Sequence, residues 1–171
     1  GAKYVVYSDA ACTQVVQELI TDANGYAESQ SLPLGTYYYQ ETEAPETVVM
    51  DSEIHEFKLT FNGNIVTETV INKVREGKLH IIKKDESENP VAGVKFEILD
   101  MDMKKVTEMV TDANGDAISG DIEKGTYYYR EVEAPAGHVV DNSLHQFTIE
   151  YDGQNVIETM INNFVKGKLR I

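Results

Sequence analysis

The sequence is poor in features that identify many common classes of protein. Its 171 residues include one cysteine, Cys12, four prolines and no tryptophan. A single cysteine excludes an internal disulfide and a metal site built from thiolates. No apolar run approaches the roughly 18 residues of a membrane-spanning helix, and no basic segment followed by an apolar one marks a leader. We therefore expect any targeting signal to lie outside these residues, and any covalent reinforcement to use chemistry other than a disulfide.

Basic residues are also scarce. The chain has 15 Lys and Arg against 29 Asp and Glu, which gives a net charge of −14. The acidic excess is shared, because residues 1–76 carry 4 basic and 12 acidic side chains and residues 77–171 carry 11 and 17. A surface of this charge repels phosphate backbones and anionic lipid, so we expect neither a nucleic-acid partner nor a membrane partner.

What the sequence does contain is an internal repeat. A shift of 90 residues aligns 21–81 with 111–171 without a gap, and 30 of these 61 positions are identical. Repeats of this kind indicate a tandem array of one structural unit. We expect one unit at residues 1–74, a complete one at 75–166, and the start of a further first strand at 167–171.

Within each unit the pattern is that of β-strands. β-branched and aromatic residues dominate short runs bounded by turn signals such as Ala113-Asn114-Gly115. No stretch has apolar residues at helical spacing over the length of a helix. Short strands in a unit of about 90 residues predict an all-β fold, with tandem immunoglobulin-like β-sandwiches. The strand runs are 95–99, 126–130, 146–151 and 156–161, with another expected at 78–84.

The two ends of the repeat do not match. Residues 1–9 align with 93–100, so the first unit has no counterpart of 77–92 and lacks its N-terminal strand. Conversely, 167–171 begins a strand with no domain behind it. An unpaired sheet edge accepts an added strand. We therefore expect 167–171 to add to the first unit of another molecule, head to tail.

Several motifs together resemble a known family. These are GKLHIIKKD, PVAGVKFEILD, TDANG, GTYYYREVEAPAGH and a closing INN. Their order is similar to that of the B-type domain of the Cna collagen adhesin (CnaB, or SpaA-like), which recurs in adhesins and pilins of Gram-positive bacteria. The resemblance covers residues 77–166 and most of 1–76. It implies transthyretin-like sandwiches in an extracellular, cell-surface protein, with any cell-wall anchor outside these residues.

The resemblance also implies a spontaneous isopeptide bond between the first and last strands. Carried over by position, the amine of Lys83 attacks the side-chain amide of Asn162, the acid Glu131 assists, and ammonia leaves. The first unit retains Glu41 and Asn72 but has no lysine aligned with Lys83. Its site is therefore expected to be vestigial.

The residues themselves are consistent with this chemistry. The attacking amine must be neutral, and an apolar interior favours the neutral forms of amines and carboxyls, so that a protonated glutamate can polarise the amide carbonyl and shuttle protons. Strand alternation places Lys83 on the face of Leu79 and Ile81, and Glu131 on that of Tyr129. In a regular strand Glu158 would lie on the same face as Asn162, so we expect a bulge or a switch of faces near Glu158. The neighbouring alternatives, which we interpret as solvated or structural, are Lys84, Glu133 and Asn163.

Other signals are weak. His55 and His145 are equivalent in the repeat, but neither has a His, Cys and Asp cluster with metal-ligand spacing around it in the sequence. No Ser-His-Asp order and no glycine-rich phosphate loop occur. We therefore expect no metal, no cofactor and no turnover enzyme, since the isopeptide reaction happens once, within the protein.

The resulting prediction is a structural stalk module of a surface adhesin or pilus-like protein, cross-linked in its second unit. Its first partners are the neighbouring repeats of its own chain. The alternative is a module that binds a host protein or glycan through its loops, and the divergence between 46–48 and 136–138 leaves room for it.

Overall fold

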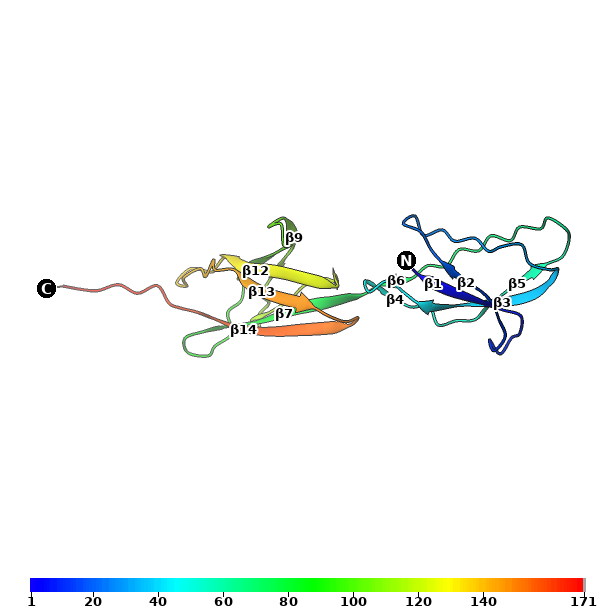
Figure 1. Cartoon of the computed structure of the whole chain (residues 1–171). Coiled ribbons are helices and arrows are strands. Elements are labelled where there is room, and N and C mark those ends of the chain that lie inside the picture. Colours follow the sequence, from blue (N-terminus) through cyan, green and yellow to red (C-terminus); the bar gives the residue numbers. More distant parts are fainter. Residues whose placement is uncertain (171) are drawn as a thin grey trace. The chain divides into compact units, whose positions relative to one another are not determined.

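The computed structural model describes residues 1–170, which form two compact units divided between Val74 and Arg75 (Figure 1). Every regular element among these residues is a β-strand. No helix in the described chain is long and apolar enough to cross a membrane. The all-β prediction is therefore confirmed, and each unit is described by itself below.

The second unit is a sandwich of two sheets. One sheet has the order β13-β12-β8-β9, and in the other β10, β11 and β14 all pair with β7 (Figure 1). β7 and β14 are parallel, and the other pairs are antiparallel. The strands are β7 (Glu76–Asp85), β8 (Lys95–Leu99), β9 (Lys105–Val110), β10 (Asp116–Ile118), β11 (Ile122–Glu123), β12 (Gly125–Glu133), β13 (His145–Ile149) and β14 (Gln154–Asn162).

The core of the second unit comes from the facing sides of the two sheets. Leu79 and Ile81 of β7 are fully buried against Phe96 and Ile98 of β8 and Ile149 of β13. These residues alternate with exposed or half-buried ones, as expected for strands with one face toward a core. The face of β7 that carries Leu79 and Ile81 therefore points into the sandwich.

The last strand is regular along its whole length. β14 pairs with β7 without a register shift, from Gln154 opposite Gly77 to Asn162 opposite Asp85. The bulge expected near Glu158 is therefore wrong. The sequence suggested a bulge because Glu158 has the parity of the inward residues, but its side chain is only half-buried in the structure.

The burial of Tyr129, together with the charge of Glu158, raises the pKa of the Tyr129 hydroxyl to about 12.

The TDANG turn of the second unit packs closely on β7. Gly115 has φ +81°, a conformation that favours glycine, and its backbone accepts and donates at the turn. A Cβ at this position would lie 2.4 Å from the carbonyl oxygen of Lys83. Glycine is therefore required both by the turn and by the close approach of β7.

The first unit contains one four-stranded sheet with the order β2-β1-β3-β5, and a separate pair formed by β4 and β6. Its sheet corresponds to β9-β8-β12-β13 of the second unit. The strands are β1 (Lys3–Tyr7), β2 (Val15–Ile20), β3 (Gly35–Glu43), β4 (Val48–Val49), β5 (His55–Leu59) and β6 (Lys73–Val74).

The first unit departs from the second by more than one strand. The segments 26–28, 32–33 and 64–72, which align with β10, β11 and β14, form no strand. In the second unit all three of these strands pair with β7. Among the described residues, none pairs with these three segments as β7 does with their counterparts.

Candidate cross-linking site

Three polar side chains lie inside the apolar sandwich of the second unit. Lys83 and Glu131 are completely buried, and Asn162 is 1% exposed. Lysine and glutamate are almost never fully buried unless they are paired. The three residues come from three strands, β7, β12 and β14, and two of these belong to one sheet and one to the other.

The topology brings these residues to one place. In the parallel pair of β7 and β14, Lys83 lies opposite Met160, so Asn162, two residues further on, points to the same face. That face is the inward one, since Leu79 and Ile81 share it. On the opposing sheet, Glu131 follows Tyr129 by two residues and also points inward.

One carboxyl group bridges the other two groups. The Nζ of Lys83 lies 3.0 Å from the Oε2 of Glu131, and the Nδ2 of Asn162 donates to Oε1 at 2.9 Å. The same Nδ2 donates to the backbone oxygen of Val139 at 3.2 Å. The ring centroid of Phe96 lies 5.8 Å from the lysine nitrogen. Both nitrogens are therefore held at the two oxygens of a single carboxyl.

The polar groups of this site are incompletely satisfied. Among the described residues, Lys83 Nζ, Glu131 Oε2 and Asn162 Oδ1 are buried without a hydrogen-bond partner, although the first two form a close ion pair. Burying such groups costs free energy that a pair only partly offsets. The site therefore holds an amine, a carboxyl and an amide in direct contact inside an apolar core.

The carboxyl group contacts the amide nitrogen of Asn162, while the carbonyl oxygen of that amide faces no donor. Each oxygen of Glu131 therefore faces one nitrogen, that of Lys83 or that of Asn162. A contact of Glu131 with the amide carbonyl, which the chemistry of a buried carboxyl led us to expect, does not form.

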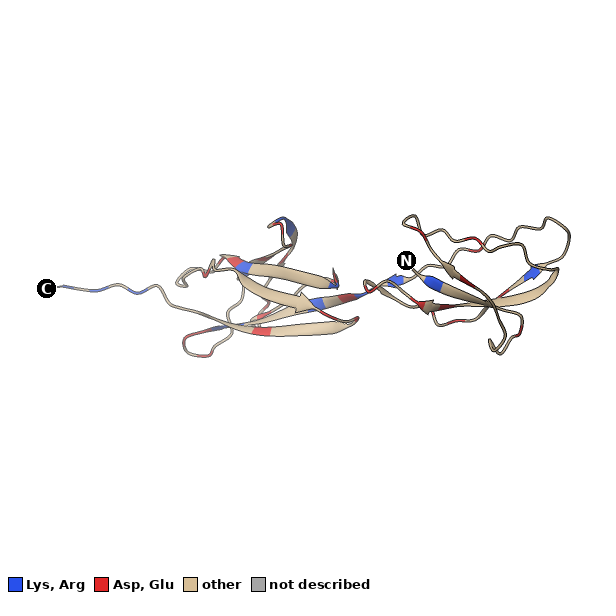
Figure 2. Cartoon of the chain, in the orientation of Figure 1, with Lys and Arg blue, Asp and Glu red and all other residues tan. Residues whose placement is uncertain are grey.

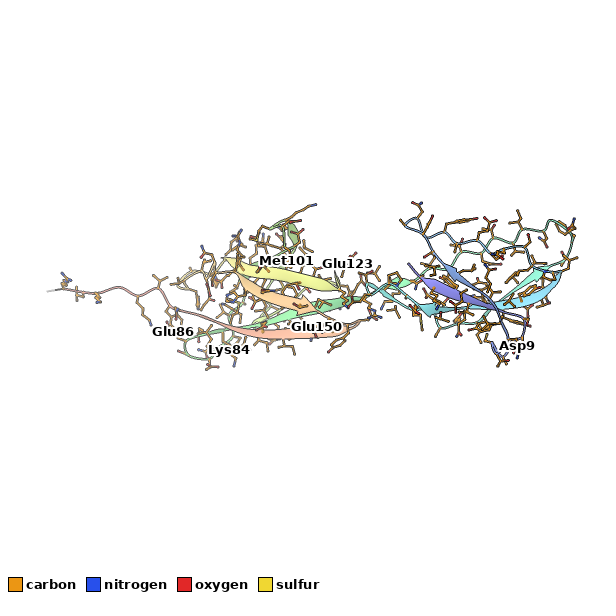
Figure 3. The ribbon with its side chains drawn as sticks, viewed as in Figure 1. Asp9, Lys84, Glu86, Met101, Glu123 and Glu150 are labelled. Atoms are coloured by element: carbon orange, nitrogen blue, oxygen red, sulfur yellow. The ribbon has the colours of Figure 1, made fainter. Side chains whose placement is uncertain are left out.

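The neighbouring alternatives lie outside the core. Lys84, labelled in Figure 3, has a side chain that is 36% exposed and lies 2.9 Å from Glu88. Glu133 and Asn163 are both exposed. Strand alternation separates Lys84 and Asn163 from the buried trio, and a register shift of β12 between Glu131 and Glu133 separates Glu133 from it. Of the lysine, glutamate and asparagine candidates, only Lys83, Glu131 and Asn162 meet.

The first unit repeats two thirds of this arrangement. Glu41 is 2% exposed, and Asn72 Nδ2 donates to both of its carboxylate oxygens, at 3.0 and 2.7 Å. The same nitrogen donates to the oxygen of Val49 at 3.1 Å, as its counterpart does to Val139. The backbone nitrogen of Asp51 donates to Glu41 at 2.6 Å. The acid and the amide are therefore in contact in the first unit, while none of the residues 1–74 aligns with Lys83.

Sequence reasoning missed the backbone groups around these sites. Val49 and Val139 each supply a carbonyl to the asparagine amide. Asp141 lies nearby, and hydrogen bonds from Ser143 lower its pKa, with smaller contributions from the charges of His145 and Lys83. A signal for both was available, because the valine and the aspartate recur at the repeat spacing of 90 residues.

One expectation about histidine needs correction. Ligand atoms of Asp51, Glu53 and His55 all lie within 4.8 Å of one another, so an acidic group does surround His55. The sequence did not reveal this group because its three members occupy every second position, from a loop into the start of a strand. His55 Nε2 lies 2.9 Å from Asp51, and its ring stacks on Tyr39 with a centroid distance of 4.9 Å. These contacts account for the position of His55.

Comparison with known proteins gives the family. The family described as "SpaA: Prealbumin-like fold domain" matches residues 1–74 and 77–163. The chain belongs to this family. The collagen adhesin of Staphylococcus aureus is 32% identical over 108 residues, which are 58% of this chain and 9% of the adhesin.

Solved structures agree with this membership. The Bacillus anthracis TIE protein superposes with a TM-score of 0.82 and 29% identity, over 94% of this chain and 30% of that chain. A C-terminal fragment of the pilus adhesin SpaC from Lactobacillus rhamnosus GG superposes with a TM-score of 0.62 and 17% identity, over 98% of this chain and 90% of that one. The similarity to the SpaC fragment shows a shared fold alone. The SpaA-like prealbumin fold is thus confirmed, and the chain spans less than a third of the adhesin and of the TIE protein.

Proposed function

We propose that this chain is a structural stalk module of a Gram-positive surface adhesin or pilus-like protein, held at the cell surface by an anchor elsewhere in its parent. Its second unit is locked by an amide bond between Lys83 and Asn162. The observation that carries the proposal is the burial of Lys83, Glu131 and Asn162 around one carboxyl group. Membership in the SpaA family and similarity to a collagen adhesin support the cellular role.

The proposed reaction needs only groups within the site. Glu131 takes a proton from the ammonium of Lys83, and the neutral Nζ attacks the side-chain carbonyl carbon of Asn162. A carbon–nitrogen bond forms to Nζ, and the bond to Nδ2 breaks. The attacking nitrogen loses a proton and Nδ2 gains one through Glu131, so ammonia leaves and no oxidant is needed. The rigid strands supply proximity, which contributes much of the rate in reactions of this kind.

The bond changes how the second unit carries tension. Force that enters at Glu76 passes along β7 to Lys83, crosses the amide bond and leaves after Asn162. Residues 84–161 then carry no load. Without the bond, the same pull shears the parallel ladder of β7 and β14, whose hydrogen bonds are the connection between the two ends. A covalent path therefore suits a module that spaces a binding tip away from the cell wall.

Single-molecule pulling of the full chain tests this role. We expect the wild-type second unit to release no extension from 84–161, and Asn162→Ala to restore an extension of about 270 Å, from about 3.4 Å per extended residue. The first unit serves as an internal reference in every trace. Equal extension of wild type and variant would contradict the proposal.

A second proposal concerns assembly. Residues 167–171 repeat the G-K-L-x-I pattern of β7, and Lys168 and Arg170 lie within this segment, next to Lys166. Figure 2 shows blue along this C-terminal stretch. Residues 1–76 carry eight more acidic than basic groups, 12 against 4. We propose that this segment adds as a strand to the first unit of another molecule. Sedimentation at increasing concentration tests it: self-association that is lost on deletion of 167–171 is expected, and a monomer at every concentration would contradict it.

A further inference from the structure

The loop that leads into β5 carries a group of metal-ligand side chains. Asp51, Glu53 and His55 each offer one ligand atom, and these three atoms lie within 4.8 Å of one another. The cross-linking chemistry proposed above uses none of these side chains. One imidazole and two carboxylates form a ligand set that suits Zn²⁺ and related divalent ions.

The spacing of the three residues explains why their side chains meet. They occupy alternate positions of an extended stretch, because 51–54 contains no turn or helix and β5 begins at His55. Alternate residues of an extended chain project to the same side, and their Cα atoms are about 6.6 Å apart. Carboxylate and imidazole side chains are long enough to close this gap. The pattern D-x-E-x-H therefore gathers three ligands on one side of the chain.

The loop is held by contacts that fix two of the three ligands. Oδ1 of Asp51 accepts a hydrogen bond from the backbone nitrogen of Glu53 at 2.9 Å, and the backbone nitrogen of Asp51 donates to buried Glu41 at 2.6 Å. Oδ2 of Asp51 lies 2.9 Å from Nε2 of His55. The ring of His55 stacks on Tyr39 with a centroid distance of 4.9 Å. Ligands that are already ordered lose less conformational entropy when an ion binds.

The charge of the site favours a cation. Hydrogen bonds from the backbone of Glu53 and from the ring of His55 lower the pKa of Asp51, so its carboxylate is ionised at neutral pH. Glu53 is exposed and adds a second carboxylate. Residues 1–76 carry 12 acidic and 4 basic side chains. A negative surface of this kind raises the local concentration of cations.

The second unit contains the same loop with one ligand replaced. Asp141, Ser143 and His145 occupy the equivalent positions, and the backbone nitrogen of Ser143 donates to Oδ1 of Asp141 at 3.1 Å. The hydroxyl of Ser143 bonds to the same carboxylate and lies 3.2 Å from Nε2 of His145. A neutral hydroxyl is not among the usual ligands of zinc. The two loops therefore share a conformation and differ in the third carboxylate.

The accessibility of the site is a property of this loop. The side chains of Asp51 and His55 are 22% and 30% exposed, and those of Asp141 and His145 are 45% and 37% exposed. The second unit, in which β7 is part of the sandwich, thus leaves the equivalent positions at least as open. An ion can reach both loops from solvent.

A zinc ion fits the group after a small closure. Tetrahedral Zn²⁺ with bonds of about 2.0–2.1 Å holds its ligand atoms about 3.4 Å apart. The atoms of Asp51 and His55 are already 2.9 Å apart, and no separation in the group exceeds 4.8 Å. Rotation of the exposed Glu53 side chain closes the remainder. Three protein ligands leave one position of the ion open to water.

We propose that Asp51, Glu53 and His55 form a zinc site in the first unit, with Nε2 of the imidazole and one oxygen of each carboxylate as ligands. The ion takes the place of the hydrogen bond between His55 and Asp51, and the neutral imidazole then carries its proton on Nδ1. The site ties the loop to the start of β5. It is independent of the amide bond proposed for the second unit, where Ser143 supplies no carboxylate.

Zinc chloride titrated into the untagged full chain at neutral pH tests the site. Calorimetry should give one tight equivalent per chain, and of the four histidines His55 should be the first whose ring signals shift in NMR spectra. Glu53→Ser gives the first unit the ligands of the second, and it should weaken binding by at least the tenfold loss that even outer-shell changes cause. Because Glu53 is exposed, this variant keeps the core of the unit intact.

Ser143→Glu supplies the matched gain of function. It should add a second equivalent of zinc per chain, accompanied by a shift of the His145 ring signals. Equal binding by wild type and Glu53→Ser, first shifts at a histidine other than His55, or the absence of saturable binding would each overturn the site. A Ser143→Glu chain that binds no more zinc than wild type would overturn it as well, because the third carboxylate would then not decide binding.

Discussion

The substitution Asn162→Ala tests the energetic role of the proposed bond. A bond between Lys83 and Asn162 closes a loop of about 80 residues, which by the chain-entropy relation used for disulfides stabilises the fold by about 4.5 kcal/mol. In the linked unit the N–H of the new amide takes the place of Nδ2 beside buried Glu131, so the variant also loses a hydrogen bond to this carboxyl, which contributes about 1.5–3 kcal/mol. We therefore expect the free energy of unfolding of the second unit to fall by about 6–7.5 kcal/mol.

The first unit supplies a matched control. Asn72→Ala removes the same side chain from the same kind of contact with Glu41, but breaks no cross-link. Only the hydrogen-bond contribution should be lost there. The difference between the two losses, about 4–5 kcal/mol, therefore isolates the effect of the covalent bond.

Hydrogen exchange with peptide resolution is the appropriate assay, because both units lie in one chain and their unfolding must be followed separately. Protection of β7, β12 and β14 reports the second unit, and protection of β1 and β3 reports the first. A loss in Asn162→Ala no larger than the loss in Asn72→Ala would refute the reasoning.

Three further predictions concern the same unit. Glu131→Gln should leave the chain at its full mass and destabilise the second unit by about 3–5 kcal/mol more than Asn162→Ala, measured by exchange, because Lys83 remains as an unpaired buried charge; equal losses would contradict this. Gly115→Ala should destabilise its unit far more than Gly25→Ala does, in thermal melts, because only the first Cβ meets the backbone of β7; similar melting shifts would show that β7 does not pack there. Hydrogen bonds from the backbone of Asp116 and Asn114 lower the pKa of Asp112 from its ordinary value of 3.8. The ionised carboxylate therefore stabilises the fold fully at a pH above 3.8. This contribution is lost as the pH falls through the lowered pKa. The destabilisation caused by Asp112→Ala should therefore shrink in acid, and a constant penalty across this range would oppose the assignment.

The sequence was sufficient for the all-β fold and for the inward direction of the proposed site residues Lys83 and Glu131. Period-two runs and a gapless repeat predict the strands, and strand parity places Lys83 and Glu131 on inward faces. The same parity argument failed at Glu158. A half-buried glutamate at the edge of a core needs no bulge, and parity alone does not report depth.

Other features depend on contacts that a linear pattern does not contain. The carbonyls of Val49 and Val139 act through backbone geometry, and the orientation of the Asn162 amide toward Glu131 depends on all three strands. The sequence also did not predict that the segments 26–28, 32–33 and 64–72 form no strand. Their counterparts in the second unit all pair with β7, and such a shared partner is a property of sheet topology.

The most direct test of the central claim is the intact mass of the chain under denaturing, reducing conditions. The account predicts a mass lower than that of the sequence by one ammonia, with Lys83 joined to Asn162 in peptide maps and Asn72 unmodified. A mass equal to that of the sequence would contradict the covalent lock, even though the sandwich fold would stand.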